Sequence, residues 1–174
     1  MDAPITLVPI GPVPGDLLAW LKNRLAKTVN CNVEIGHEVS PPSVGYDPHR
    51  RQYRGDALIE TLRALPYPGV ERLLGLIDAD CYAPNLNFIF GQATLGGREA
   101  FIALPRLRPS FYNLPEDTTL FRERVLKEAI HELGHTWGLF HCPHPHCVMH
   151  FSNRLEDTDI KGADFCPQCR NLMA

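Results

Sequence analysis

Hydrophobic residues along the first forty positions follow two periodicities, one typical of strands and one typical of helices. Residues 5–10 (ITLVPI) and 31–39 (CNVEIGHEV) are short runs rich in apolar side chains, and they predict two strands. Residues 14–29 lie between them and predict a helix, because leucines recur there at helical spacing: Leu17, Leu18, Leu21 and Leu25. The order of strand, helix and strand predicts a crossover unit.

The middle of the chain predicts a loop, a helix and three further strands. Residues 40–50 are proline-rich and predict the loop, while Leu58, Leu62 and Leu65 lie on one face of a helix near residues 53–65. The strands LLGLIDA, NFIFGQATL and EAFIALP follow at residues 73–79, 87–95 and 99–105. Two turn signals separate them, Ala83-Pro84-Asn85 and Gly96-Gly97. We therefore expect an antiparallel meander beside the first two strands.

The longest predicted helix begins where Asp117 or Thr118 can cap its first turn. An apolar stripe along this helix predicts that it packs on the sheet: Leu126, Ile130, Leu133 and Trp137. With 174 residues and 44% hydrophobic content, the chain fits one domain better than two. We predict a single α/β (α+β) domain over residues 1–174, with a mixed, mostly five-stranded sheet and one long helix.

The end of this helix carries the most informative motif of the chain, HELGHTWGLFH, which starts at His131. His131 and His135 lie on one helix face, so both imidazoles can reach one metal ion, and Glu132 lies beside them. The backbone must turn near Gly138 if His141 is to supply a third ligand. Three neutral imidazoles leave a fourth position for water, whose pKa zinc lowers to roughly 7. The spacing predicts a catalytic zinc site.

Glu132 is the candidate general base for hydrolysis of an amide bond. We predict that it takes a proton from the metal-bound water and returns it to the leaving nitrogen, while zinc stabilises the developing oxyanion. The alternative is a catalytically silent zinc protein that holds peptides in the same cleft with the same three histidines. The presence of Glu132 favours the enzyme, because binding alone has no need for that base. HExxH also occurs by chance, but the further requirement for Gly138 and His141 makes chance improbable.

Composition and charge narrow the classes of partner and compartment. The net charge is −3 with acids and bases interspersed, so neither nucleic acid nor an anionic membrane is expected as a partner. The first residues contain Asp2 and several prolines, which argues against a secretory signal, and no apolar stretch is long enough to span a membrane. We expect a cytoplasmic, reducing location, a peptide or protein substrate, and a monomer.

Four of the six cysteines have the spacing of a second zinc site. Cys142 and Cys147 form C-x4-C, and after a gap of eighteen residues Cys166 and Cys169 form C-x2-C. Four thiolates give a closed tetrahedral site, so this zinc is predicted to be structural and to stabilise the C-terminal region, residues 142–174. Two disulfides or free thiols are the alternatives, and disulfides would be favoured by export.

The remaining histidines and cysteines have simpler interpretations. His144, His146 and His150 can substitute as metal ligands, but we predict that they are ordinary loop histidines. Cys31 and Cys81 have no partner at ligand spacing and are predicted to be small core residues.

A methionine downstream of the motif adds a resemblance to a known superfamily. Met149 lies eight residues after His141 in the sequence CVM, as in the methionine turn of metzincins. The combination of HExxHxxGxxHC, C-x4-C, CVM and a final CxxC resembles the archaemetzincins. Residues 78–84, 87–93 and 106–112 also look like segments of that family.

The resemblance to archaemetzincins implies a zincin-like fold and a zinc peptidase with two zinc ions per chain. It further implies that Met149 forms an apolar floor beneath the metal and that residues 87–93 form an edge strand. An extended substrate would lie antiparallel to that strand, above the helix. Some metzincins use a tyrosine to assist the oxyanion; we assign that role to neither Tyr82 nor Tyr112. A docking module for nucleic acid built on the four cysteines is poorly supported, because acids outnumber bases around Cys166.

Overall fold

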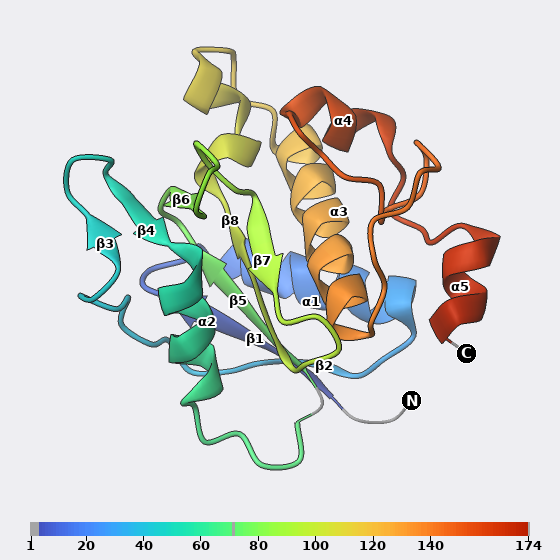
Figure 1. Cartoon of the computed structure of the whole chain (residues 1–174), viewed down its shortest axis with the longest axis horizontal. Coiled ribbons are helices and arrows are strands. Elements are labelled where there is room, and N and C mark those ends of the chain that lie inside the picture. Colours follow the sequence, from blue (N-terminus) through green and yellow to red (C-terminus); the bar gives the residue numbers. More distant parts are fainter. Residues whose placement is uncertain (1–3, 71, 174) are drawn as a thin grey trace.

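A computed structural model describes residues 4–70 and 72–173 of the chain. Asp2, which argued against a secretory signal, lies outside these residues. Within them the main sheet has five strands in the order β2-β1-β5-β8-β7 (Figure 1). Their bounds are Val33–Ile35 (β2), Ile5–Ile10 (β1), Arg72–Ile77 (β5), Glu99–Ala103 (β8) and Gly91–Ala93 (β7). The first four strands are mutually parallel, and β7 is antiparallel to β8. The predicted α/β class with a mixed five-stranded sheet is confirmed.

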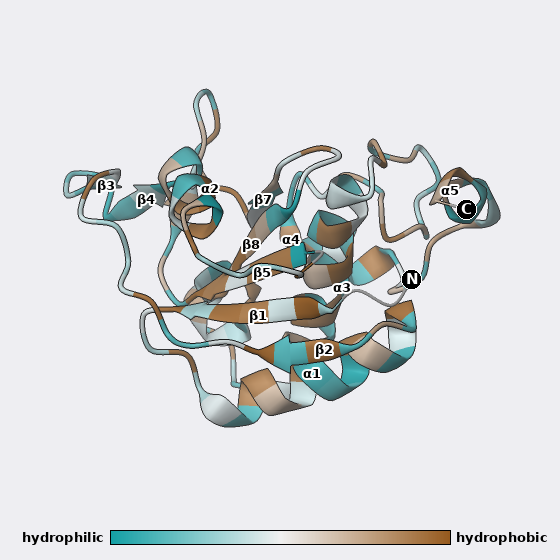
Figure 2. Ribbon diagram, turned by 90° about the horizontal axis from the view of Figure 1, so that it is seen from below, coloured by the Kyte–Doolittle hydropathy of each residue, from teal (hydrophilic) through white to brown (hydrophobic). Residues whose placement is uncertain are grey.

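Helices cover both faces of this sheet because side chains of alternate strand residues point to opposite faces. On one face Leu74, Leu76 and Ile102 pack against α1 (Gly15–Val29) and α3 (Thr118–Thr136) in one apolar cluster. On the other face Phe101 and Ile77 pack against α2 (Gly55–Arg63) in a second cluster. Figure 2 shows the hydrophobic residues of β1 in brown, between α1 and α2. The site helix α3 is therefore held by a buried apolar interface.

The predicted crossover unit is confirmed, and the predicted meander is wrong. The helix α1 connects β1 to β2, which pair in parallel. After β5, however, the chain first forms β7 at the sheet edge. It then returns through a hairpin and forms β8, which lies between β5 and β7. Only the pair β7 and β8 is antiparallel among the three strands predicted to form the meander. The turn at residues 83–85 therefore does not close a hairpin between neighbouring strands.

A second, smaller sheet replaces part of the predicted loop. Its order is β3-β4-β6, with bounds Tyr46–Asp47, Gln52–Arg54 and Cys81–Tyr82. It lies beside the N-terminus of α2, at the end of the main sheet where the chain leaves β5 (Figure 1). Two 3-10 helices, Pro105–Leu107 and Pro109–Tyr112, then lead from β8 towards α3.

The C-terminal part of the chain consists mostly of turns. After α3 it contains α4 (Leu155–Ile160), which packs beside α3, and α5 (Pro167–Met173), which lies farther from α3 at the side of the molecule (Figure 1). None of the helices in the described residues is both long enough and apolar enough to cross a membrane.

Candidate active site

The three histidines of the motif converge at the C-terminal end of α3. Their ligand nitrogens all lie within 4.8 Å of one another, and Nε2 of His131 is 3.2 Å from Nε2 of His135. Zinc bonds to imidazole nitrogen at about 2.0–2.1 Å, and a tetrahedral site of that size has ligand nitrogens about 3.3 Å apart. The separation of the first two histidines therefore fits a zinc ion.

A glycine turn brings His141 back to the other two histidines. The helix ends at Thr136 with Trp137 as its C-cap, and Gly138 follows with φ at 88°, a left-handed conformation that glycine adopts without steric cost. The amide of Leu139 donates to the carbonyl of Gly134 at 3.0 Å, and that of Gly138 to His135 at 2.9 Å. This is the Schellman pattern that closes a helix C-terminus. The turn predicted at Gly138 is confirmed.

Backbone carbonyls fix the tautomer of two of the imidazoles. Nδ1 of His131 lies 2.8 Å from the carbonyl oxygen of Val148, and Nδ1 of His135 lies 2.7 Å from that of Leu139. A carbonyl oxygen only accepts, so each Nδ1 carries the proton and each Nε2 presents a lone pair. Burial also lowers the pKa of both residues and of His141, which favours neutral rings. Two facing lone pairs at 3.2 Å fit a cation bound between them.

Glu132 lies on the floor of the cleft, directly beneath β7. Its side chain is buried, and burial raises the pKa of its carboxyl well above the usual range, with a further contribution from the negative charge of Glu128. A Cβ atom on Gly91 would lie 2.9 Å from Oε1 of Glu132 and 2.5 Å from the carbonyl oxygen of Phe101. The strand can approach Glu132 this closely because residue 91 has no side chain.

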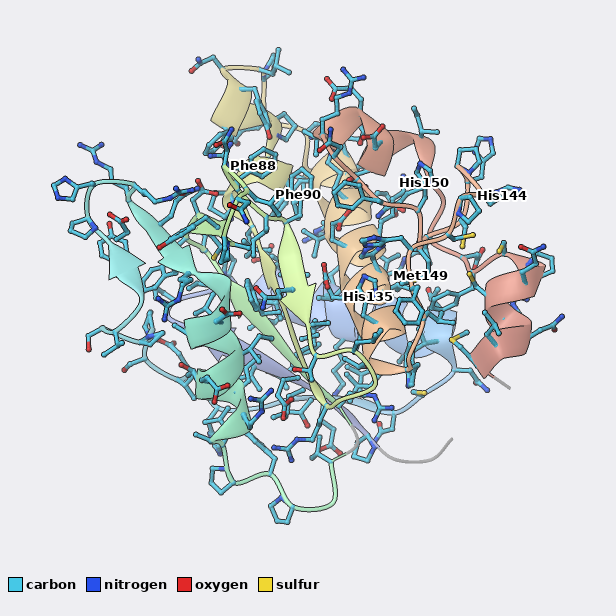
Figure 3. All side chains as sticks on the ribbon, viewed as in Figure 1. Phe88, Phe90, His135, His144, Met149 and His150 are labelled. Carbon is cyan, nitrogen blue, oxygen red and sulfur yellow. The ribbon has the colours of Figure 1, made fainter. Side chains whose placement is uncertain are left out.

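Met149 packs against α3 at Gly134, the residue before His135. It is fully buried, and a Cβ atom on Gly134 would overlap its sulfur. Figure 3 shows Met149 and His135 side by side near the end of α3, whereas His144 points away from them. The glycine of HELGH thus leaves the space that Met149 fills.

A cleft of about 740 Å³ opens above these groups. Its floor contains His131, Glu132, His135 and His141. One wall is formed by residues 83–93, including all of β7, and the opposite wall contains side chains of the loops after α3: Phe140, Phe151, Ser152 and Asn153. The prediction that residues 87–93 provide an edge strand is confirmed for β7, although residues 87–90 lie before the strand.

The four C-terminal cysteines form a second cluster. Sγ of Cys142 is 3.8 Å from Sγ of Cys166, and Sγ of Cys147 is 3.8 Å from Sγ of Cys169. Zinc bonds to thiolate at about 2.3 Å, which places tetrahedral sulfurs about 3.8 Å apart. The amide of Cys169 donates to Cys166 and lowers the pKa of that thiol to about 7. The four sulfurs fit zinc, and none of them is in a disulfide.

The other candidates lie outside both clusters. His144 and His146 are exposed, and Nδ1 of His150 lies 2.9 Å from the carbonyl oxygen of Cys142. Neither Tyr82 nor Tyr112 is among the described residues that line the cleft. The remaining two cysteines also lack a place in either cluster: Cys31, which is partly buried, and Cys81, which is fully buried.

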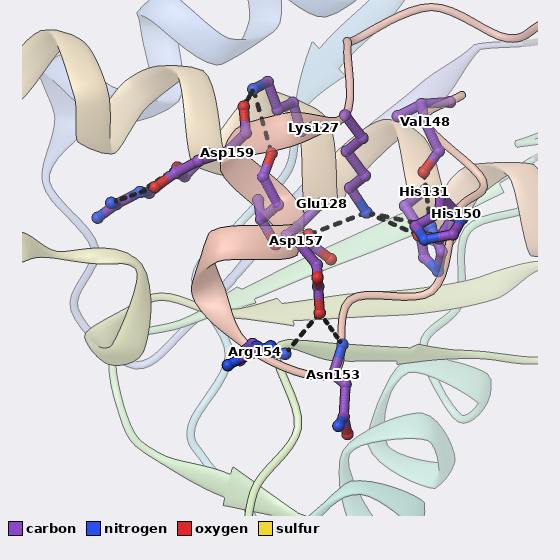
Figure 4. A network of polar contacts seen from close by, with 12 residues as sticks. Lys127, Glu128, His131, Val148, His150, Asn153, Arg154, Asp157 and Asp159 are labelled. Carbon is purple, nitrogen blue, oxygen red and sulfur yellow. Dashed lines mark hydrogen bonds and ion pairs between the residues drawn. The ribbon is translucent and has the colours of Figure 1, made fainter. Parts of the chain in front are cut away.

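Sequence reasoning missed a buried ion pair beside the first histidine. Nζ of Lys161 lies 3.1 Å from Oε1 of Glu128, 3.3 Å from the carbonyl oxygen of His150 and 3.4 Å from Nδ1 of His131. Thr158 donates to the same carboxylate oxygen of Glu128 at 2.8 Å. Figure 4 shows this network, which joins α3, α4 and the turn at residues 148–150. The sequence signal that could have pointed to Glu128 is its spacing from His131, Glu128-x2-His131, which places both residues on one helix face.

Comparison with known proteins identifies the family. The model of peptidase family M54 matches residues 43–174. The chain belongs to peptidase family M54. It is 45% identical to the archaemetzincin of Pyrococcus abyssi over 171 residues, covering 95% of this chain and 91% of that protein. It is 40% identical to the archaemetzincin of Methanocaldococcus jannaschii over 166 residues, covering 95% and 89%.

Solved structures of M54 relatives have the same fold. The crystal structure of archaemetzincin from Methanopyrus kandleri matches with a TM-score of 0.88 and 38% identity, covering 99% of this chain and 93% of that one. Archaemetzincin from Archaeoglobus fulgidus, complexed with malonate, matches with a TM-score of 0.84 and 37% identity, covering 97% and 99%. The predicted resemblance to archaemetzincins is confirmed, and so is the prediction of a zinc metallopeptidase, a hydrolase.

Proposed function

We propose that this M54 chain hydrolyses peptide bonds with a zinc ion held by His131, His135 and His141 and with Glu132 as general base. The observation that carries the proposal is the convergence of three neutral imidazoles and one buried carboxylate on the floor of one cleft. Zinc bound there would lower the pKa of a water ligand and withdraw charge from the substrate carbonyl.

Glu132 performs the proton transfers in this proposal. Its carboxylate accepts a proton from the attacking water and delivers it to the leaving nitrogen. Its burial in the floor of the cleft, among the residues that line the cleft with the three histidines, supports this role. Met149 supports the site by filling the space at Gly134, between the two helical histidines.

The strand β7 is the proposed docking edge for the substrate backbone. It pairs with β8 on one side and lies at the edge of the described sheet, so its outer backbone groups are available to a peptide in the cleft. A peptide added antiparallel to β7 would pass above Glu132, which contacts this strand at Gly91.

A second, structural zinc is proposed for Cys142, Cys147, Cys166 and Cys169. The sulfur separations support tetrahedral coordination, and a closed four-sulfur site offers no position for substrate. Since Cys142 follows His141 directly, this zinc would also position the third histidine. We propose that residues 1–174 form one monomeric peptidase domain that has no nucleic-acid or membrane partner and acts in the cytoplasm.

The test is cleavage of a diverse peptide mixture, analysed by mass spectrometry, with zinc-loaded wild type and an identically prepared Glu132→Gln variant. We expect cleavage by the wild type and a loss of at least about a thousandfold in the variant, with zinc content unchanged. Full activity of the variant would exclude Glu132 as the base. Absence of cleavage by both proteins, with their zinc confirmed, would favour the silent peptide-binding protein.

A further inference from the structure

Large apolar side chains are exposed on both walls of the cleft. Phe140 is 73% exposed, Leu95 48%, Phe151 46% and Leu86 45%, and all four line the cleft together with the three histidines. Burying a large apolar side chain is favourable, so exposed ones gathered in one concave site indicate a ligand that covers them. The four residues are called the apolar rim below.

The apolar rim brackets the path of an extended peptide. Leu86 lies five residues before β7 and Leu95 two residues after it, so a leucine flanks the proposed docking edge on each side in the sequence. Phe140 immediately precedes His141, and the ring of Phe151 lies 4.9 Å from the ring of His141. A peptide lying along β7 therefore meets apolar surface on both walls, on either side of the histidines.

Hydrogen bonds hold the leucine wall in place. Nη2 of Arg50 donates to the carbonyl oxygens of Leu86 at 3.1 Å and Asn87 at 3.2 Å, and Nε2 of Gln52 donates to Asn87 at 2.9 Å. At the other end, the amide of Gly96 donates to the carbonyl of His135 at 2.9 Å. Because this wall is already ordered before binding, less conformational entropy is lost when a peptide binds, and the contacts contribute more to affinity.

The charged side chains of the cleft lining are all acidic. They are Asp56, Glu128 and Glu132, and none of the described lining residues is a lysine or an arginine. Glu128 is neutralised by Lys161, whereas Asp56 is exposed at the wall beside Gln92, which donates to it at 2.9 Å. On the cleft walls, away from the zinc ion proposed at the floor, a carboxylate on a substrate side chain would lose hydration and meet no lysine or arginine among the described lining residues.

We propose that the substrates are extended peptides with large apolar side chains on both sides of the cleaved bond, and that acidic side chains at these positions are excluded. This inference rests on the proposed peptidase function. It names the substrate class, and it assigns the discrimination to the apolar rim.

The first arm of the test compares three peptides on zinc-loaded wild type. The parent peptide carries leucine on both sides of its cleaved bond. The second peptide carries alanine at these two positions, and the third carries aspartate. Mass spectrometry maps the cleaved bond. We expect kcat/KM to fall about tenfold for alanine and about a hundredfold or more for aspartate. The alanine effect should lie mainly in KM, because the lost contacts are made equally before and during reaction.

The second arm assigns the preference to residues of the chain. Phe140→Ala and Leu95→Ala should each reduce the preference for leucine over alanine by about threefold or more. Leu114→Ala is the matched control, since Leu114 is 59% exposed in a loop and is not among the residues that line the cleft. It should keep the wild-type preference. Zinc content of every variant is measured, so that lost metal is not mistaken for lost specificity.

A third arm separates failure of this inference from failure of the proposed function. Fluorescence anisotropy measures binding of the labelled leucine, alanine and aspartate peptides to the zinc-loaded Glu132→Gln variant. Cleavage by wild type with equal rates for all three peptides would overturn the substrate class and leave the peptidase intact. Selective binding of the leucine peptide without cleavage by wild type would support the apolar rim and reject the peptidase. If the wild type shows no selective cleavage and the variant shows no selective binding, the inference is overturned.

Discussion

The two clusters of metal-ligand residues are neighbours in the chain, at His141 and Cys142, but they are carried by different kinds of structure. Two of the three histidines belong to α3, a 19-residue helix whose residues Leu126, Ile130 and Leu133 are fully buried against α1 and the sheet. The cysteines belong to turns and to α5, which has seven residues. One cluster is built on the core, and the other on its surface.

This difference indicates which cluster depends on its metal. Packing of α3 and hydrogen bonds from the two Nδ1 atoms to backbone carbonyls orient His131 and His135, so the histidine site is ordered by the fold itself. Helices as short as α4 and α5 are not stable alone in water. Beyond the buried residues 147–149, we therefore expect the C-terminal region to depend on metal at the four-cysteine site and on the contacts of α4 with α3.

The largest expected effect is that of Cys166→Ser. Loss of one of four thiolates should abolish binding at the structural site and lower the free energy of unfolding by about 5 kcal/mol or more. Hydrogen exchange should rise strongly over residues 142–173 and much less over α3. Zinc content and exchange mass spectrometry measure the two parts separately.

Cys31→Ser is the matched control, because Cys31 lies outside the cluster and the variant should keep two zinc ions per chain. Equal increases in exchange over α3 and the C-terminal region would contradict the contrast between the two clusters. Unchanged zinc content in Cys166→Ser would contradict the structural site.

The metal-ligand residues were predictable because their signal is local. The spacing of His131 and His135 follows from one helical turn, and Gly138 marks the turn that returns His141. The cysteine pairs are likewise close in sequence. The separations between ligand atoms, Nε2 to Nε2 in the histidine cluster and Sγ to Sγ in the cysteine cluster, agree with the zinc sites that this spacing predicts.

Strand order was less predictable, because it depends on contacts between distant segments. Residues 87–90 have the composition of a strand, yet the carbonyl of Asn87 accepts from Gln52 and Arg50 rather than from a neighbouring strand. The strand β7 begins only at Gly91, and it lies outside β8 at the sheet edge. The Glu128–Lys161 pair was missed for the same reason, since charges far apart in sequence reveal no partner.

Lys161→Met tests the junction between the two regions and should have the next largest effect. Lys161 comes from the C-terminal region and its buried ammonium neutralises Glu128 of α3. Among the described residues, its removal leaves the buried carboxylate of Glu128 with the Thr158 hydroxyl as its hydrogen-bond donor, which should cost about 3–5 kcal/mol of unfolding free energy. Denaturant titration of the zinc-loaded protein measures the loss.

The double variant Glu128→Gln with Lys161→Met is the control for this junction. Removing both charges should restore most of the stability, because no uncompensated charge remains. If the double variant is as unstable as the single one, the lysine acts through its bond to the carbonyl of His150 instead. That result would make the turn at residues 148–150, rather than the ion pair, the link between the regions.

The smallest expected effect is that of Asp117→Ala, at the end of α3 opposite to the histidines. The side chain of Asp117 accepts from the amide of Leu120 at 2.9 Å and caps the first turn. Its loss should lower the free energy of unfolding by about 1 kcal/mol. Zinc affinity should not change, because the buried stripe of α3 still fixes His131 and His135. A tenfold loss of zinc affinity in this variant would show that the histidine site depends on the whole length of the helix, and the contrast with the cysteine cluster would then be one of degree.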